Sequence, residues 1–239
     1  MKVDILAIGA HPDDVELGCG GTIAKLISEG KKVAIIDLTE GELGTRGTNE
    51  TRAQEAATAS EILGISAREN LKMKDGFIIN SQEYQFRIIE MIRKYQPEIV
   101  LCNAIDDRHP DHAKAAKLVS DACFLSGLVK IKTDYEGKSQ KFWRPKQVFH
   151  YIQWKNIEPD FVMDISGFLD KKIEACLAYK TQFYDPTSTE PMTPIATKDF
   201  LESLTYRAQD LGRLSGVEYA EGFTTEKLLA FKNFEGIIC

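Results

Sequence analysis

Ile5-Leu6-Ala7-Ile8-Gly9-Ala10 is a short apolar run, and His11-Pro12-Asp13-Asp14 follows it directly. A second apolar run, Ile99-Val100-Leu101-Cys102, precedes Asp106-Asp107-Arg108-His109-Pro110-Asp111-His112. Three of the four histidines of the chain lie in these two segments. Each segment comes just after a predicted strand and carries carboxylates beside its histidines. This pattern indicates a metal site built from two loops at one edge of a sheet.

Strand-like and helix-like patterns alternate along the chain. This alternation predicts a parallel sheet with right-handed crossovers. Neither a linker nor an internal repeat divides the chain, so we expect one domain over residues 1–239. The polar segment 127–146 is predicted to be a surface excursion, and 185–195 a proline-rich loop. The predicted strands are 3–9, 32–38, 70–73, 98–102, 148–153 and 161–165, and the predicted helices are 18–30, 51–63, 82–95, 112–125, 167–180 and 198–214.

The predicted fold class is α/β: a Rossmann-like, doubly wound, mostly parallel sheet with helices on both faces. In such sheets of order 3-2-1-4-5, ligands bind at the carboxyl ends of strands 1 and 4, where the winding reverses. If residues 3–9 form strand 1 and 98–102 form strand 4, the two histidine segments become neighbours at that crevice.

Composition excludes several classes of protein. The chain has 239 residues and a net charge of −6, which gives no electrostatic reason to expect nucleic acid or an anionic membrane as partner. No apolar stretch approaches the roughly 20 residues of a membrane span. The five cysteines are scattered, with no C-x-x-C pair, so a disulfide framework does not fit and we expect a cytoplasmic protein.

The residue types in the two segments suit a hydrolytic zinc site, which needs about three ligands and one open position for water. His11 and Asp14 are three residues apart and can approach one ion from a single turn. His109 and His112 share this spacing, so one can bind metal while the other faces the substrate. The pair Asp13-Asp14 offers one carboxylate to the metal and leaves the other as a general base.

Other interpretations remain open at this point. Each motif alone could be a loop whose aspartates cap the next helix. Two histidines and one carboxylate also form the facial triad of non-haem Fe(II) oxygenases, although these enzymes are usually β-rich. A non-catalytic nucleotide-binding module is a third possibility, but Gly18-Cys19-Gly20-Gly21 lacks the G-x-G-x-x-G spacing and is better explained by close helix–sheet packing. His150 and Cys19 are expected to be packed residues rather than ligands.

The two motifs together resemble those of the PIG-L-like (LmbE-like) zinc N-deacetylases. Further matching strings span nearly the whole chain and resemble most the branch that deacetylates N-acetylglucosaminyl-malate in bacillithiol biosynthesis. One departure is Val15 between Asp14 and Glu16, where many family members have glutamate directly after the aspartates. These strings are Gly18-Cys19-Gly20-Gly21-Thr22-Ile23, Asp37-Leu38-Thr39-Glu40-Gly41-Glu42, Gly44-Thr45-Arg46-Gly47-Thr48, Glu50-Thr51-Arg52-Ala53-Gln54-Glu55-Ala56, Met163-Asp164-Ile165-Ser166, Tyr179-Lys180-Thr181-Gln182 and Tyr219-Ala220-Glu221-Gly222-Phe223.

The resemblance implies a role for each site residue. The implied metal ligands are His11, Asp14 and His112, with zinc as the expected ion and another divalent metal such as Fe²⁺ as the alternative. Asp13 matches the general base, His109 the residue that stabilises or protonates the tetrahedral intermediate, and Asp111 its orienting partner. The family arginine maps onto Arg52, which the resemblance therefore implies as a substrate-binding residue.

The expected reaction is removal of acetate from an N-acetylglucosaminyl compound. The malate conjugate is the expected substrate, with another N-acetylglucosamine conjugate as the alternative. Because malate carries two carboxylates, Arg46 and Arg108 are candidates to bind it. We expect a homo-oligomer that acts on a small molecule, with neither nucleic acid nor membrane as partner.

Overall fold

The computed structural model describes residues 1–231 and 233, and the fold it shows is the predicted α/β class. Its main sheet has the order β3-β2-β1-β4-β7-β9-β8. The first five strands in this order are parallel, and β9 is antiparallel to both β7 and β8. The strands are β1 (Ile5–Gly9), β2 (Val33–Thr39), β3 (Ala67–Met73), β4 (Ile99–Cys102), β7 (Gln147–Tyr151), β8 (Phe161–Asp164) and β9 (Ala220–Thr225).

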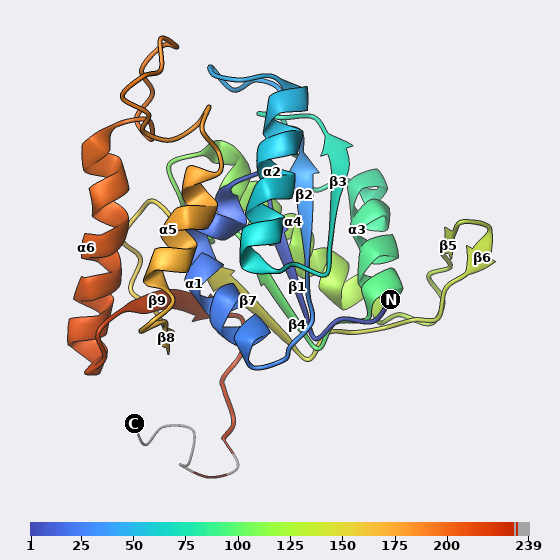
Figure 1. Ribbon diagram of the computed structural model, residues 1–239. Helices are drawn as coiled ribbons and strands as arrows, with labels where there is room; N and C mark the ends of the chain where they lie inside the picture. The colour runs from blue at the N-terminus through green and yellow to red at the C-terminus, as the bar shows by residue number, and fades with distance from the viewer. Residues whose placement is uncertain (232, 234–239) are drawn as a thin grey trace.

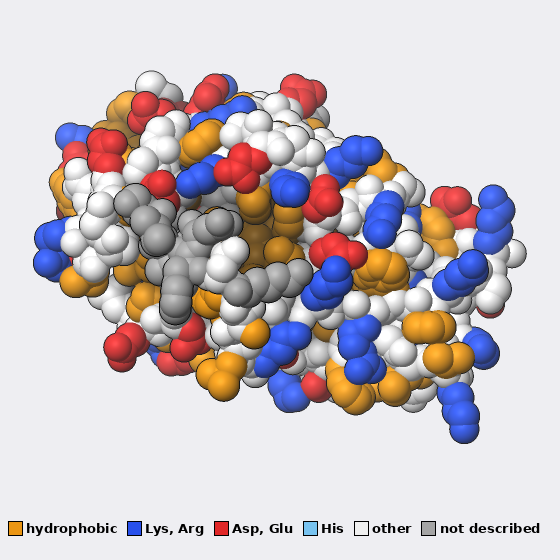
Figure 2. All heavy atoms as spheres, turned by 90° about the horizontal axis from the view of Figure 1, so that it is seen from below, with side chains coloured by type: hydrophobic (Ala, Val, Ile, Leu, Met, Phe, Trp, Pro, Cys, Tyr) orange, Lys and Arg blue, Asp and Glu red, His pale blue; other side chains and the backbone are white. Residues whose placement is uncertain are grey.

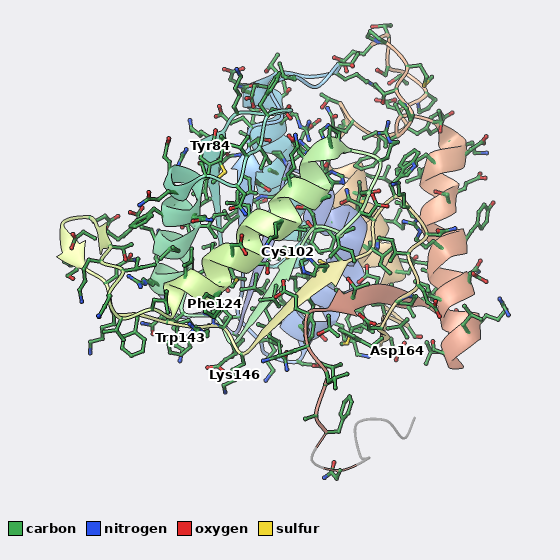
Figure 3. All side chains as sticks on the ribbon, turned by 180° about the vertical axis from the view of Figure 1, so that it is seen from behind. Tyr84, Cys102, Phe124, Trp143, Lys146 and Asp164 are labelled. Atoms are coloured by element: carbon green, nitrogen blue, oxygen red, sulfur yellow. The ribbon has the colours of Figure 1, made fainter. Side chains whose placement is uncertain are left out.

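Helices cover both faces of the sheet, as predicted. Helices α1, α2 and α5 lie on the face toward the viewer in Figure 1, and α3 and α4 lie on the other face, which Figure 3 shows from behind. Helix α6 packs beside β9 at the far edge. The helices are α1 (Asp14–Ser28), α2 (Asn49–Leu63), α3 (Gln82–Tyr95), α4 (Pro110–Ser126), α5 (Leu169–Leu177) and α6 (Lys198–Ser215).

The sheet separates two main hydrophobic clusters, because side chains of successive strand residues point to opposite faces. In β1, Leu6 and Ile8 pack into the cluster beneath α3 and α4, whereas Ile5 and Ala7 pack into the cluster beneath α1. Both faces of β1 are therefore buried, which explains why its sequence is a continuous apolar run.

The sequence missed β9 and misplaced several element ends. In β9, Glu221 interrupts the apolar pattern by which a buried strand is recognised. It can be buried because Lys172 neutralises its charge at 2.6 Å. Helix α1 begins at Asp14 rather than at residue 18, since the helix tolerates its glycines at the cost of non-helical geometry at Cys19. Strand β3 begins three residues before the predicted start, and α5 is shorter than predicted.

The glycines of α1 have the predicted packing role. A Cβ on Gly18 would lie 2.1 Å from the ring of Tyr151, and one on Gly21 would lie 2.7 Å from Ile165. Cys19 lies between them and is fully buried. Glycine is therefore required where α1 approaches the sheet closely.

The predicted excursion at 127–146 carries a small hairpin, β5 (Asp134–Tyr135) and β6 (Lys138–Ser139), which projects from the body at one side (Figure 1). Among the described cysteines, Cys19, Cys102, Cys123 and Cys176 are free and buried, while Cys239 lies outside the described residues. None of the described helices is long and apolar enough to cross a membrane. On the face of the molecule shown in Figure 2, basic, acidic and hydrophobic side chains are interspersed.

Candidate metal and catalytic site

The two histidine segments lie side by side, because β1 and β4 are neighbours and the winding of the sheet reverses between them. A hydrogen bond joins the two loops: the backbone N–H of Ala10 donates to Oδ1 of Asn103 at 2.8 Å. The two segments therefore meet at the strand ends, where the predicted topology puts them.

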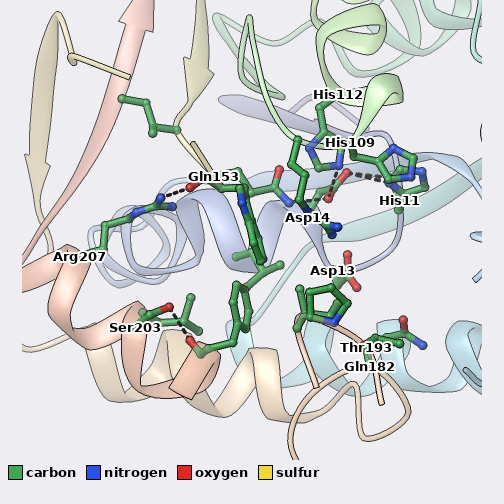
Figure 4. Close-up of a pocket in the computed structure, with 18 of the residues that line it drawn as sticks. His11, Asp13, Asp14, His109, His112, Gln153, Gln182, Thr193, Ser203 and Arg207 are labelled. Carbon is green, nitrogen blue, oxygen red and sulfur yellow. Dashed lines mark hydrogen bonds and ion pairs between the residues drawn. The ribbon is translucent and has the colours of Figure 1, made fainter. Parts of the chain in front are cut away.

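The Asp14 carboxylate lies between two imidazole rings. Its Oδ2 is 3.4 Å from Nδ1 of His11, and its Oδ1 is 3.2 Å from Nε2 of His112. Asn103 and Gln153 also donate to this carboxylate, at 2.9 and 2.6 Å. The three residues that the resemblance implies as metal ligands thus converge (Figure 4).

Two further aspartates hold the outer sides of these rings, and sequence reasoning missed both. Asp75 lies 3.0 Å from Nε2 of His11, and Asp107 lies 2.7 Å from Nδ1 of His112. A carboxylate on the far nitrogen of a histidine is the usual support of a metal-binding ring, because it fixes the tautomer and the orientation. Asp107 stands inside the second motif and Asp75 follows β3, so a search for carboxylates at strand ends would have found them.

The site has more negative than positive protein charge. Five aspartates are buried here, namely Asp13, Asp14, Asp75, Asp107 and Asp111. Burial alone would lower the pKa of His112, but the charge of Asp14 and the hydrogen bond with Asp107 raise it to about 9. Despite burial, the hydrogen bonds with Asp111, Asp14 and Asp75 likewise raise the pKa of His11 above its ordinary value. Nitrogens of His11, His109 and His112 lie within 4.8 Å of one another, so imidazoles and carboxylates suited to a divalent cation are present.

Asp13 has a different environment from Asp14. It is the N-cap residue of α1, yet its side chain makes no capping hydrogen bond, which excludes the capping interpretation for this residue. Its φ of 113° is strained for a residue with a side chain, and such strain is common at functional sites. Arg52 of α2 donates to its Oδ2 at 3.1 Å and also to the backbone oxygen of Pro12. Burial raises the pKa of Asp13 to about 7, although Arg52 opposes the shift.

His109 precedes α4 and lies against the other two rings, with centroids 4.5 Å from His11 and 5.2 Å from His112. Its Nδ1 accepts the backbone N–H of Asp111 at 3.2 Å, so a neutral ring carries its proton on Nε2. Burial, together with His11 and His112, lowers the pKa of His109. The carboxylate of Asp111 accepts backbone N–H groups of Gly76 and Ile78 and lies 3.6 Å from His11. It therefore supports His11, whereas its link to His109 runs through its backbone.

The three arginines of the predicted substrate site do not come together. Arg52 lines the cavity but is engaged with Asp13. Arg108 lines it as well, with its guanidinium 4.4 Å from the ring centroid of Trp154. Arg46 is buried outside the cavity lining, where it pairs with Glu190 at 3.3 Å and hydrogen-bonds Ser188. Because these contacts tie down the proline-rich loop, the structure places Arg46 where it does not fit the predicted malate-binding role.

The cluster of histidines and aspartates opens into a cavity of about 1140 Å³. Its lining includes His11, Asp13, Asp14, His109 and His112. Residues of α6, of the loop after β7, of the segment after β2 and of the proline-rich loop contribute other parts of the lining. Figure 4 shows Arg207 reaching from α6 toward the segment that carries Gln153. The cavity has room for more than a single sugar ring.

Comparison with known proteins agrees with this geometry. Residues 6–123 match the family model described as PIG-L: GlcNAc-PI de-N-acetylase. The diacetylchitobiose deacetylase of Thermococcus kodakarensis is 30% identical over 229 residues, 91% of this chain and 81% of that protein. A probable N-acetyl-alpha-D-glucosaminyl L-malate deacetylase 2 of Bacillus subtilis is 29% identical over 199 residues, 76% of this chain and 84% of its own. A 4-oxalmesaconate hydratase of Pseudomonas putida is 27% identical over 197 residues, 75% of each chain.

Among solved structures, the conserved protein TT1542 of Thermus thermophilus superposes with a TM-score of 0.86 and 34% identity, covering 98% of this chain and 99% of that one. The fold and the site define a Rossmann-like α/β protein with a centre of histidines and aspartates. The chain belongs to the PIG-L family, as the sequence motifs predicted. It is an N-deacetylase.

Proposed function

We propose that this enzyme removes acetate from N-acetylglucosaminyl-malate, with zinc bound by His11, Asp14 and His112. The observation that carries the reaction is the pair of adjacent aspartates: Asp14 lies between two histidines, while Asp13 is free of them and faces the cavity. The coarser activity, deacetylation of an N-acetylglucosamine-type substrate, follows from the family.

When bound, the metal supplies a polarised water whose pKa is near 7 and a positive charge for the developing oxyanion. Asp13 accepts the proton of the attacking water, for which a pKa of about 7 is well matched. Arg52 keeps the carboxylate oriented. Nε2–H of His109 donates a hydrogen bond to the oxyanion. Because the pKa of His109 is lowered, the neutral ring is favoured as this donor. The C–N bond then breaks as Asp13 passes its proton to the leaving amine, and acetate is released.

The malate conjugate is favoured over a neutral disaccharide by the charge at the α6 end of the cavity. Arg108 and Arg207 both line it, and neither has an ion pair within the described residues. The relative from Bacillus subtilis is named for this substrate, whereas the relative from Thermococcus kodakarensis is named for a neutral one. The buried free cysteines are consistent with a reducing compartment such as the cytoplasm.

A substrate panel tests the proposal. Acetate release is measured with N-acetylglucosaminyl-malate, diacetylchitobiose and free N-acetylglucosamine, on enzyme whose metal content is determined by mass spectrometry. We expect about one zinc per chain and the highest kcat/KM for the malate conjugate. A higher kcat/KM for diacetylchitobiose would refute the malate assignment, and release of acetate from none of the three would refute this substrate class.

A further inference from the structure

Arg207 is a half-buried cation without a carboxylate partner. It comes from α6 and lines the cavity. Its hydrogen bonds within the described residues both leave from Nη2, to the backbone oxygen of Trp154 and to Oδ1 of Asn156 at 3.2 Å. Asp107 acts on Arg207 electrostatically, but its carboxylate is already engaged by His112 and by backbone N–H groups. A guanidinium withdrawn from water in this way is poised to meet an anion.

Arg108, which is far from Arg207 in the sequence, contacts the same tryptophan. It precedes α4, is exposed, and its guanidinium lies over the Trp154 ring. The ring is fixed in turn by stacking on Phe200 of α6, at 5.2 Å between centroids and 16° between planes. Two arginines from distant parts of the chain are therefore held against one rigid residue in the cavity wall.

The acidic groups on this side of the cavity do not neutralise the two arginines. Asp210 pairs with Arg213 at 2.8 Å, and Asp106 pairs with Lys155 at 2.8 Å. Glu158 also lines the cavity, but it is exposed and forms no ion pair within the described residues. Among the described residues that line this end of the cavity, two cations, Arg108 and Arg207, are therefore without an ion pair, although the chain as a whole carries −6.

We propose that Arg207 and Arg108, both held against Trp154, form a subsite that binds an anionic group on the aglycone of the substrate. The inference rests on the proposed function, since the aspartates and histidines at the other end of the cavity must receive the acetamide. The planar forks of the two arginines suit a carboxylate or a phosphate equally well. Sequence reasoning missed Arg207 because it lies on a distant helix and outside both motifs.

The test compares anionic and neutral substrates on matched variants. Arg207→Gln and Arg108→Gln are assayed with N-acetylglucosaminyl-malate, N-acetylglucosamine 1-phosphate and the neutral methyl N-acetylglucosaminide. Lys198→Gln is the control, because Lys198 lies on the same helix, is exposed and is not among the residues that line the cavity. For each subsite variant we expect kcat/KM to fall about ten- to a hundredfold on the preferred anionic substrate and less than about threefold on the neutral one. Whichever anionic substrate shows this loss identifies carboxylate or phosphate as the group bound.

A merely structural role for Arg207 would give a different pattern. If it only holds the loop through Trp154, Arg207→Gln would lower kcat/KM equally for all three substrates, and this would overturn the proposal. Arg207→Lys keeps the charge and should retain more of the preference for the anionic substrate than Arg207→Gln does.

Calorimetric titration with malate and with inorganic phosphate separates this proposal from the proposed function, because it needs no turnover. Wild type should bind one of these anions more tightly than Arg207→Gln does. Equal affinity of the two proteins for both anions would refute the subsite even if the enzyme deacetylates all three compounds.

Discussion

Asp13 and Asp14 show how neighbouring residues of the same type acquire different chemistry. Asp14 accepts hydrogen bonds from Asn103 and Gln153 and lies beside two histidines, whose interactions outweigh burial and lower its pKa well below the ordinary value. Asp13 has only Arg52, and burial raises its pKa to about 7. The paired motif was visible in the sequence. The supporting residue Asn103 was not, because nothing in its local sequence links it to Asp14 far away in the chain.

The two aspartates should respond differently to loss of their charge. Asp13→Asn should keep the metal and slow turnover by roughly 10²–10⁴-fold, because a general base is lost while the proposed ligands remain. Asp14→Asn should weaken metal binding, because a ligand and the contact with both histidines are lost. Metal content and kcat are measured on both purified variants. If Asp13→Asn loses the metal and Asp14→Asn retains it, the two assignments must be exchanged.

At the scale of elements, apolar runs in the sequence predicted strands correctly, whereas a strand with buried polar residues was not recognised. The parallel strands β1, β2 and β4 were predicted nearly residue for residue, because both of their faces are buried. Strand β9 was missed, since Glu221 is buried in it and accepts from Thr22 and Lys172. No local pattern reveals that a carboxylate has a partner on another element. For the same reason, sequence analysis did not single out Arg207 of α6. It also proposed Arg46 as a substrate-binding residue, because its partners on the proline-rich loop could not be foreseen.

His150 of β7 joins this strand to the segment after β9, through Nε2 and the carboxylate of Glu226 at 3.0 Å. Burial opposes protonation of His150, but its interactions with Cys102, Glu226 and the backbone of Asn103 raise its pKa to about 11. Because the pKa of His150 is higher in the folded state, its protonation stabilises the fold. This stabilisation is complete at pH values below the pKa of the unfolded state, about 6.5, and is lost as the pH rises toward the pKa of the folded state.

The free energy of unfolding should therefore depend on pH through this pair. We expect wild type to be more stable than Glu226→Gln near pH 6, with the difference shrinking steadily up to pH 10. Urea denaturation across this range measures it. Glu61→Gln serves as the control, because Glu61 is exposed and has no ion pair within the described residues. A difference that is constant or grows with pH would contradict the role given to His150.

For the whole molecule, the winding of the sheet is what assembles the site. Reversal between β1 and β4 brings His11 and His112 together, and this could be predicted because the order of strands follows from the alternation of elements. The shape of the cavity could not be predicted in the same way. Its outer wall is made by α6 and the loop after β7, and the packing of α6 at the sheet edge depends on β9, the strand that sequence analysis missed.

The same assembly couples metal binding to stability. Five aspartates are buried around the three histidines, and Arg52 pairs with Asp13. A divalent ion should therefore relieve the repulsion between the carboxylates in the folded state. At a metal concentration about 100 times Kd, binding contributes about 2.7 kcal/mol when the unfolded chain does not bind. For a chain of this size each kcal/mol shifts Tm by roughly 2–4 °C, so chelation should lower Tm by about 5–10 °C. Scanning calorimetry with and without chelator measures the shift. Asp13→Asn should keep the shift and His112→Ala should lose it, whereas an equal shift in wild type and His112→Ala would mean that the stabilising ion binds elsewhere.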